Sequence, residues 1–377
     1  MGPYATQILG DLGAEVITVE PPRGDNNRSM GEGPLPQLSG VALNLLRNKR
    51  NVSLDFKTED GHRALLAIAA TCDVVVTNLR PGTLARGRIG YADISICRPD
   101  VIYCQAHGYS SDGPRRNEPA YDDVIQTETG IADATSRLTG RPMISATIMA
   151  DKVCGLTIVY SVLAALYRRA VSGQGEHIEV PMADTMTAFT LVEHGAAAIP
   201  LPPLGPAGYP RVLNTERGPW RTSDGWITAL PYTKEQYDSI FAAGGREDLV
   251  GDERYATGRN RIANSPFLYH EVGSMLANGT TAEWLAFFRA HDVPAAEVGR
   301  LDDLIEELPV ADHPHAGTYR VIPPPVRFAG APLSVRRPAP LIGQHTEEVL
   351  TEAGYDAQGI ESLRKSGALG RLPVEFS

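Results

Sequence analysis

The chain has 377 residues, of which 42% are hydrophobic and 21% charged, and its formal net charge is −10 at pH 7. This length favours two domains and a hydrophobic core that needs no disulfide or structural metal. The acidic charge argues against a general nucleic-acid binder and against a protein held to a membrane by electrostatic attraction.

The first half of the chain alternates helical and extended patterns. Apolar spacing predicts helices at 3–12, 59–70 and about 150–169, with a further helix that starts at Asp184. It predicts β segments at 14–20, 52–56, 73–77, 101–105 and 177–182. Strands that alternate with helices of this length predict a parallel sheet covered on both faces. A doubly wound sheet ordinarily opens with a strand, whereas this chain opens inside a helix. Either a first strand is missing from the start, or the sheet is completed differently.

The composition changes at the proline-rich segment 200–206, which is typical of a linker. Beyond it, a strand pattern at 226–230 and helical patterns at 234–243 and 281–291 predict a smaller α+β domain. A second proline-rich passage at 323–340 leads to a terminal helix.

The cysteines and the longest apolar run indicate the cellular setting. Cys72, Cys97, Cys104 and Cys154 never approach Cys-x-x-Cys spacing, so we expect core thiols in a reducing cytosol and a cytoplasmic protein. The apolar run 153–166 is too short to cross a bilayer, so we expect a buried helix and no membrane partner.

Three common site types fit poorly. Gly173-Gln174-Gly175 follows a helix and precedes a strand, the reverse of the order in a dinucleotide fingerprint. Asp312-His313-Pro314-His315 lacks a third ligand and favours a solvated loop, so we expect no metal. No serine occupies a Gly-x-Ser-x-Gly elbow.

Asp151 stands where the long apolar helix is expected to begin. One interpretation is a carboxylate that stabilises the helix N-terminus by accepting backbone N–H bonds. The other is a nucleophile, because the same position keeps a carboxylate ionised beside an apolar cleft.

Short motifs follow one another along nearly the whole chain. They are 2–22, Asn48-Lys49-Arg50, 54–57, 78–82 with Arg86, Tyr121-Asp122, Ala150-Asp151, 173–175, 180–184, 224–226 and 343–346. In this order they resemble the class III CoA-transferase (CaiB/BaiF) family, which includes formyl-CoA transferase and α-methylacyl-CoA racemase.

The resemblance implies a Rossmann-like parallel-sheet domain built from both ends of the chain, a smaller α+β domain between them, and an interlocked homodimer. The corresponding bounds are 1–200 for the N-terminal part of the large CoA-binding domain, 201–220 for a linker, 221–318 for the small domain, and 319–377 for the return linker and the C-terminal part.

The resemblance also implies site residues. Asp151 corresponds to the nucleophilic aspartate, Asn78 and Leu79 to a CoA-binding strand end, Arg86 to a phosphate-facing arginine, Lys57 to a residue beside the adenine, and Tyr121 to a residue near the thioester. Coenzyme A and acyl-CoA are then substrates, with no permanently bound cofactor. A basic series suits the CoA diphosphate, although surface charge is the alternative for each member: Lys49, Arg50, Lys57, Arg80, Arg86 and Arg88.

The expected activity is transfer of CoA from an acyl-CoA to a free carboxylic acid, through an Asp151 anhydride and an Asp151–CoA thioester. Two alternatives stay open, an acyl-CoA racemase or epimerase and a catalytically silent CoA-binding protein. Tyr121 disfavours the racemase, since racemases of the family carry histidine there and tyrosine does not titrate near neutral pH. Arg211, Arg217 and Arg221 suit either a dicarboxylate substrate or ordinary surface charge.

Overall fold

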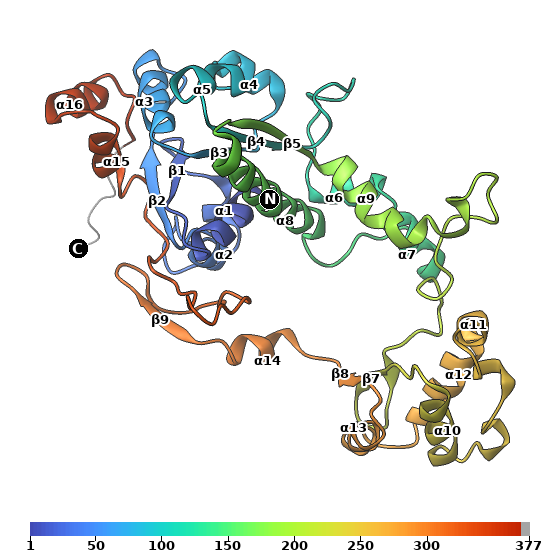
Figure 1. Ribbon diagram of the computed structural model, residues 1–377. Helices are drawn as coiled ribbons and strands as arrows, with labels where there is room; N and C mark the ends of the chain where they lie inside the picture. The colour runs from blue at the N-terminus through green and yellow to red at the C-terminus, as the bar shows by residue number, and fades with distance from the viewer. Residues whose placement is uncertain (371–377) are drawn as a thin grey trace. The chain divides into compact units, whose positions relative to one another are not determined.

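The computed structural model describes residues 1–370, which divide into two compact units (Figure 1). The first unit contains Met1–Thr129, Ser145–Phe189 and the described residues from Leu308 onward. The second contains Gly130–Ile144 and Thr190–Glu307. The domain bounds expected from the sequence stay a prediction.

Parallel strands form the centre of the first unit. β1 (Val16–Glu20) pairs with β2 (Lys49–Ser53) in one sheet. β3 (Val74–Thr77), β4 (Ile102–His107) and β5 (Glu176–Pro181) form a second sheet in that order. The mixed α/β architecture with parallel strands is therefore confirmed, but the strands make two sheets instead of one.

Helices cover both faces of these sheets (Figure 1). Cys104 and Ala106 of β4 pack with α1 (Gly2–Asp11) and α8 (Met149–Ser172), whereas Tyr103 packs on the opposite face with α3 (Glu59–Ala70) and α5 (Tyr91–Cys97). This alternation is what a strand buried on both faces requires. The other helices of the unit are η1 (Asn26–Ser29), α2 (Gly40–Leu45), α4 (Pro81–Gly87), α6 (Asp122–Glu128), α15 (Thr346–Glu352) and α16 (Ala357–Lys365), and α9 (Met182–His194) leads from this unit into the second.

An apolar cavity of about 210 Å³ lies between the two sheets. Ile17 and Val19 of β1 line it from one side, and Val74 and Val76 of β3 from the other. Helix α1 contacts both strands. Within residues 1–370, neither β1 nor β3 pairs with a strand on the side facing the cavity. Because of this gap β3 is half-buried along its length, although its apolar sequence predicts a buried strand.

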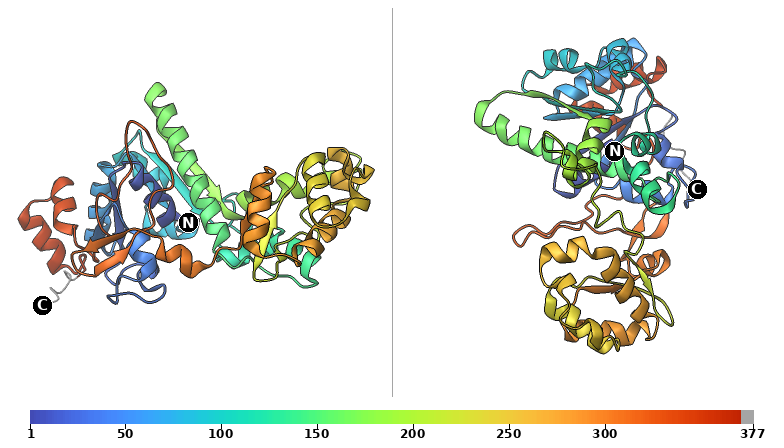
Figure 2. Two further views of the ribbon diagram at one scale, coloured as in Figure 1. Left: turned by 90° about the horizontal axis from the view of Figure 1, so that it is seen from below. Right: turned by 90° about the vertical axis from the view of Figure 1, so that its right-hand side faces the viewer.

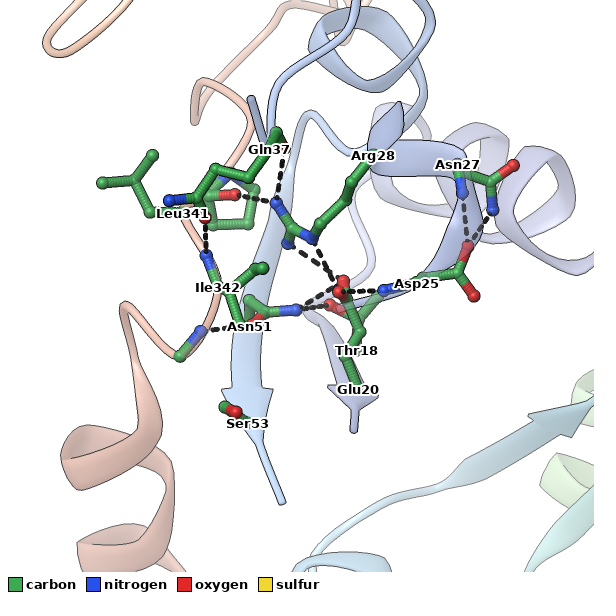
Figure 3. Close-up of polar contacts among 12 residues, drawn as sticks. Thr18, Glu20, Asp25, Asn27, Arg28, Gln37, Asn51, Ser53, Leu341 and Ile342 are labelled. Carbon is green, nitrogen blue, oxygen red and sulfur yellow. Dashed lines mark hydrogen bonds and ion pairs between the residues drawn. The ribbon is translucent and has the colours of Figure 1, made fainter. Parts of the chain in front are cut away.

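A buried ion pair ties β1 to the loops around it (Figure 3). Arg28 donates from Nε and Nη2 to the two Glu20 carboxylate oxygens, at 2.6 and 2.9 Å. Asn51 of β2 donates to Glu20 Oε1 at 2.7 Å and accepts from the Gly343 N–H at 2.6 Å. Arg28 also donates to the Pro340 carbonyl at 2.9 Å. These contacts fasten the C-terminal return segment to the first two strands.

Helix α8 is longer than the sequence predicts. It runs for 24 residues and is the one helix of the described chain that is long and apolar enough to cross a membrane. The helix extends beyond the apolar run 153–166 at both ends, and one of its sides is buried, as the sequence predicts for this run. One side of α8 packs on α1, α6, β4 and β5. Its other side leaves a stripe of large apolar side chains exposed: Leu156, Tyr160, Leu163, Tyr167 and Val171.

The second unit has its own core beneath a small antiparallel sheet. β6 (Trp220–Arg221), β7 (Trp226–Ala229) and β8 (Ala295–Glu297) form this sheet in that order. The strand and the two helices predicted between 226 and 291 are present. The helices of this unit are α7 (Ile131–Thr139), η2 (Ala196–Ala198), α10 (Lys234–Ala243), η3 (Glu247–Leu249), η4 (Glu253–Tyr255), α11 (Gly258–Ala263), α12 (Ser265–Leu276), α13 (Thr281–Ala290) and α14 (Leu301–Glu306).

Candidate active site

Asp151 lies in the first turn of α8, as its position in the sequence predicts. Its side chain is 37% exposed, and Oδ2 pairs with the amino group of Met1 at 3.2 Å. In Figure 2 the marked N-terminus lies beside this helix. The first turn of α1 therefore forms one wall around the Asp151 carboxylate.

The α8 N-terminus is capped by another helix. Ile148 occupies the N-cap position and has no side-chain acceptor, so it leaves the first N–H groups without a local partner. Asp122, the first residue of α6, accepts the Asp151 N–H at 2.9 Å. Asp122 therefore caps α8, which is the role that one interpretation of the sequence gave to Asp151. The Asp151 carboxylate does not take part in the cap.

Asn78 also lies beside the start of α1. It follows β3, and a Cβ built on Gly2 would lie 4.0 Å from the Asn78 Cβ. Pro81 opens α4, so 78–80 form a short loop at the carboxyl end of β3. Ligands of open α/β sheets bind outside this end of the strands. The structure therefore places both Asn78 and Asp151 beside the start of α1, Asn78 at Gly2 and Asp151 at Met1.

Lys57 and Arg86 come from adjacent segments. The 2.7 Å ion pair between Glu59 and Arg88 joins the start of α3 to the end of α4, and His62 Nε2 lies 3.1 Å from the Arg88 carbonyl oxygen. Lys57 and Arg86 are both exposed. Among residues 1–370, no hydrogen bond or ion pair links either side chain to Asp151. Lys57 follows β2, and Arg86 lies in the last turn of α4, the helix that follows β3. Two exposed cations on neighbouring segments suit a phosphate group.

Two more expected residues have distinct surroundings. Leu79 lines the apolar cavity between β1 and β3. Tyr121 immediately precedes Asp122 at the N-cap of α6, and its side chain is 76% exposed. Nearby, Arg80 donates to the Asn117 carbonyl at 2.8 Å, and Gly82 donates to the Asn117 side chain at the same distance.

Two members of the predicted basic series are structural. Lys49 is buried, and its Nζ donates to the Pro3 carbonyl at 2.7 Å and to Thr6 Oγ1 at 2.9 Å. Arg50 is paired with Glu348 and Glu352 at 2.8 and 2.7 Å. The sequence-based suggestion that these two cations face a diphosphate is therefore wrong, because both are consumed in holding elements together.

Asp122 lies within one of the sequence motifs but has no role predicted from the sequence, and Gln126 is not among the predicted site residues. The spacing of Asp122 and Gln126 could have indicated a contact between them, since residues four apart lie on the same helix face. The structure makes Gln126 a hydrogen-bond partner of Asp122 at 2.5 Å.

Cys154, one turn after Asp151, is a poor competing nucleophile. Burial raises the pKa of its thiol to about 12, so it stays protonated near neutral pH. All four cysteines are free thiols.

No cluster of three or more His, Cys, Asp or Glu side chains in the described chain is arranged to hold a metal ion. In the segment 312–315, Pro314 and His315 lie in an exposed turn, as the sequence predicts, whereas Asp312 and His313 end a strand. The segment belongs to the hairpin of β9 (Val310–His313) and β10 (Gly317–Arg320), and the buried His313 Nε2 lies 2.7 Å from the Ala339 carbonyl oxygen.

Comparisons with known proteins extend over nearly the whole chain. The model of CoA-transferase family III matches residues 1–346. A succinyl-CoA:glutarate CoA-transferase of Mus musculus is 31% identical over 98% of this chain and 87% of its own length. A formyl-CoA:oxalate CoA-transferase of Afipia carboxidovorans is 28% identical over 99% of this chain and 95% of its own.

Solved structures give the same result. A point mutant of Rv3272 from Mycobacterium tuberculosis superposes with a TM-score of 0.77, at 30% identity over 92% of this chain and 93% of that chain. A CaiB/BaiF family protein from Brucella suis gives a TM-score of 0.76, at 26% identity over 93% and 95%. With the family match covering all the residues of the site described above, this chain belongs to CoA-transferase family III and is a CoA-transferase.

Proposed function

We propose that this enzyme moves CoA from an acyl-CoA thioester to a free carboxylic acid, with Asp151 as the nucleophile. The observation that carries the proposal concerns Asp151. Its backbone N–H takes part in the cap of α8, whereas its carboxylate does not and is partly exposed. The backbone of Asp151 is fixed by Asp122, and within residues 1–370 its partly exposed side chain pairs only with the amino group of Met1, so the carboxylate is held in place and can be reached by a substrate, as covalent catalysis requires.

The first half-reaction loads CoA onto the enzyme. An Asp151 oxygen attacks the thioester carbonyl, the C–S bond breaks, and CoA leaves as a thiolate, which gives a mixed anhydride. The thiolate then attacks the Asp151 carboxyl carbon. The bond to the donor acyl group breaks, the donor carboxylate leaves, and an Asp151–CoA thioester remains.

The second half-reaction reverses these steps with another acid. The acceptor carboxylate attacks the Asp151 carbon and expels the thiolate, which forms a second anhydride. The thiolate attacks the acceptor carbonyl, and Asp151 returns as a free carboxylate. An aspartate suits this exchange because its carboxyl group is chemically similar to those of both substrates. The exchange of CoA between donor, enzyme and acceptor thioesters therefore stays near thermoneutral.

We further propose that CoA lies along the loops at the carboxyl ends of β2 and β3. In this arrangement Arg86 faces a phosphate, Lys57 lies beside the adenine, and Asn78 and Leu79 contact the CoA chain. Tyr121 lies near the thioester. The exposed cations at Lys57 and Arg86, on neighbouring segments, support this assignment.

The acids that relatives act on guide the choice of substrates. Relatives are named for succinyl-CoA and glutarate and for formyl-CoA and oxalate. We propose a short dicarboxylate as one of the two acids, and the first assay therefore pairs succinyl-CoA with glutarate and then with oxalate.

We also propose a homodimer. The exposed stripe of α8 is a continuous row of large apolar side chains, whose exposure to water is unfavourable. We infer that a second copy of the chain covers it.

The decisive experiment traps the covalent intermediate. The protein is incubated with an acyl-CoA donor, treated with hydroxylamine and digested for mass spectrometry. We expect a hydroxamate on the peptide that contains Asp151, and loss of both hydroxamate and transfer in Asp151→Ala with CoA binding retained. Asp302→Ala, an exposed acid on α14, is the matched control and should transfer CoA normally.

Full transfer by Asp151→Ala would contradict the nucleophile. Exchange of the substrate α-proton in D₂O without an acceptor acid would identify a racemase instead. CoA binding with no exchange across a panel of acids would identify a silent binding protein.

A further inference from the structure

We propose that Gln126 is a positioning residue for Asp151: its buried amide fixes the carboxylate of Asp122, and Asp122 fixes the Asp151 backbone. This inference rests on the proposed function, because it assigns a residue that acts on the nucleophile without touching the substrate.

Every hydrogen-bonding position of the Gln126 amide is used. Its nitrogen donates to Asp122 Oδ2 at 2.5 Å and to the Thr147 carbonyl at 3.3 Å. Its oxygen accepts from the Ser145 N–H at 2.9 Å and from the Ser145 hydroxyl at 2.7 Å. A primary amide offers two donors and two acceptor positions, so this side chain has no spare capacity.

The contacts make Gln126 a junction between two segments. It is fully buried on α6, and it holds both Asp122 on its own helix and the segment 145–147 that leads into α8. Asp122 is itself buried, and its second oxygen accepts the Asp151 N–H. The Gln126 amide thus holds the start of α8 in two ways, through Asp122 and through the segment 145–147.

The chemistry of the pair explains why an amide stands here. Asp122 is an acceptor when ionised, and it needs a donor on the oxygen that does not contact α8. Gln126 supplies that donor without adding charge. A carboxylate at the same place would repel Asp122 and leave a buried acceptor unpaired. Any resulting shift of Asp122 is passed directly to Asp151, and displacements of about 1 Å cost catalysts about 100-fold in rate.

Three variants test the role. Gln126→Met removes all four hydrogen bonds at similar volume, and Gln126→Glu removes the donor but keeps the shape. Gln105→Glu is the control for burial, because Gln105 is a buried glutamine of β4 that, in the described chain, has no hydrogen bond to Asp122 or Asp151. The measurements are kcat, the KM for acyl-CoA, the rate of hydroxamate formation at Asp151, and the melting temperature.

We expect Gln126→Met to lower kcat about 10- to 100-fold, with the KM for acyl-CoA within about twofold of the wild type. Gln126→Glu should be as slow at pH 8. Its activity relative to the wild type should rise as the pH falls, because the introduced carboxyl group, once protonated, again donates to Asp122. With a purely structural role this recovery would follow the melting temperature, whereas a positioning role raises kcat also at pH values where the variant is fully folded.

Two results would overturn the positioning role. One is a Gln126→Met variant with the wild-type kcat and wild-type rate of Asp151 labelling. The other is a Gln105→Glu control that loses as much kcat at the same loss of melting temperature, together with a Gln126→Glu profile that stays parallel to the wild type. If the wild type itself is not labelled at Asp151, the proposed function fails, and the positioning role fails with it.

Discussion

Lys49 is a lysine held inside the protein, and its titration is measurable in the free energy of unfolding. Burial lowers the pKa of this ammonium from 10.5 to about 7, against the attraction of Glu20 and Asp11. Between these two values the unfolded chain binds more protons than the folded chain. The contribution of Lys49 to stability therefore rises with pH through this window and is smallest below pH 7.

The expected result is a pH-dependent difference between the wild type and Lys49→Met. From pH 7 to pH 9 the wild type should gain stability over the variant by at most about 1.4 kcal/mol per pH unit. Urea unfolding at four pH values measures this difference. Parallel stability curves for the two proteins would show that Lys49 titrates normally.

Lys49 also shows what could not be predicted from the sequence. A search for cationic phosphate ligands selects four residues that the sequence alone does not distinguish: Lys49, Arg50, Lys57 and Arg86. Only the fold distinguishes Lys49, which bonds to α1, from Lys57, which stays exposed. Asp151, by contrast, was predictable because its helix begins with a recognisable local pattern.

Among the elements, those with strong apolar periodicity were predictable. Helices α1 and α3 lie within a residue of their expected bounds. Helices α6 and α7 were missed, because 114–148 is mostly polar and its helices are short. The network of Asp122 and Gln126 was missed with them, since it depends on where α6 meets α8.

The packing of α1 on α8 depends on one glycine. A Cβ at Gly155 would lie 2.9 Å from Tyr4 Cδ1 and 3.2 Å from the Met1 carbonyl oxygen. Gly155→Ala should lower stability by about 1–2 kcal/mol, because the overpacking outweighs the higher helix propensity of alanine. It should also lower transferase activity, since the shifted Met1 borders Asp151.

Thermal unfolding and the CoA-transfer assay together check this expectation. Gly258→Ala in α11 is the control, because its nearest neighbour would be the Arg261 guanidinium at 3.7 Å, and it should unfold at or above the wild-type temperature. A Gly155→Ala protein as stable and active as the wild type would mean that the two helices are not packed this closely.

At the scale of the whole molecule, the apolar stripe of α8 is the feature most easily tested. Replacing Tyr160 and Leu163 by lysine puts two charges into the proposed dimer interface, where desolvation is costly. We expect the doubly substituted protein to sediment as a monomer at concentrations where the wild type is a dimer. Leu301→Lys, at an exposed position of α14, should leave the dimer intact. Equal sedimentation of the wild type and the doubly substituted protein would reject this interface.

Because β1 and β3 are not paired with each other, the interior of the first unit, as described, contains two strand edges that face each other across a cavity. A sheet interior is ordinarily the slowest place for amide hydrogens to exchange with solvent, because each N–H is paired on a rigid ladder. Here the N–H groups of β1 and β3 that point across the cavity belong to edges, whereas those of β4 are paired between two neighbours. Residue-resolved exchange should find fast and slow amides alternating along β1 and β3, and uniformly slow ones along β4. The centre of this unit is then the boundary along which its two halves first separate.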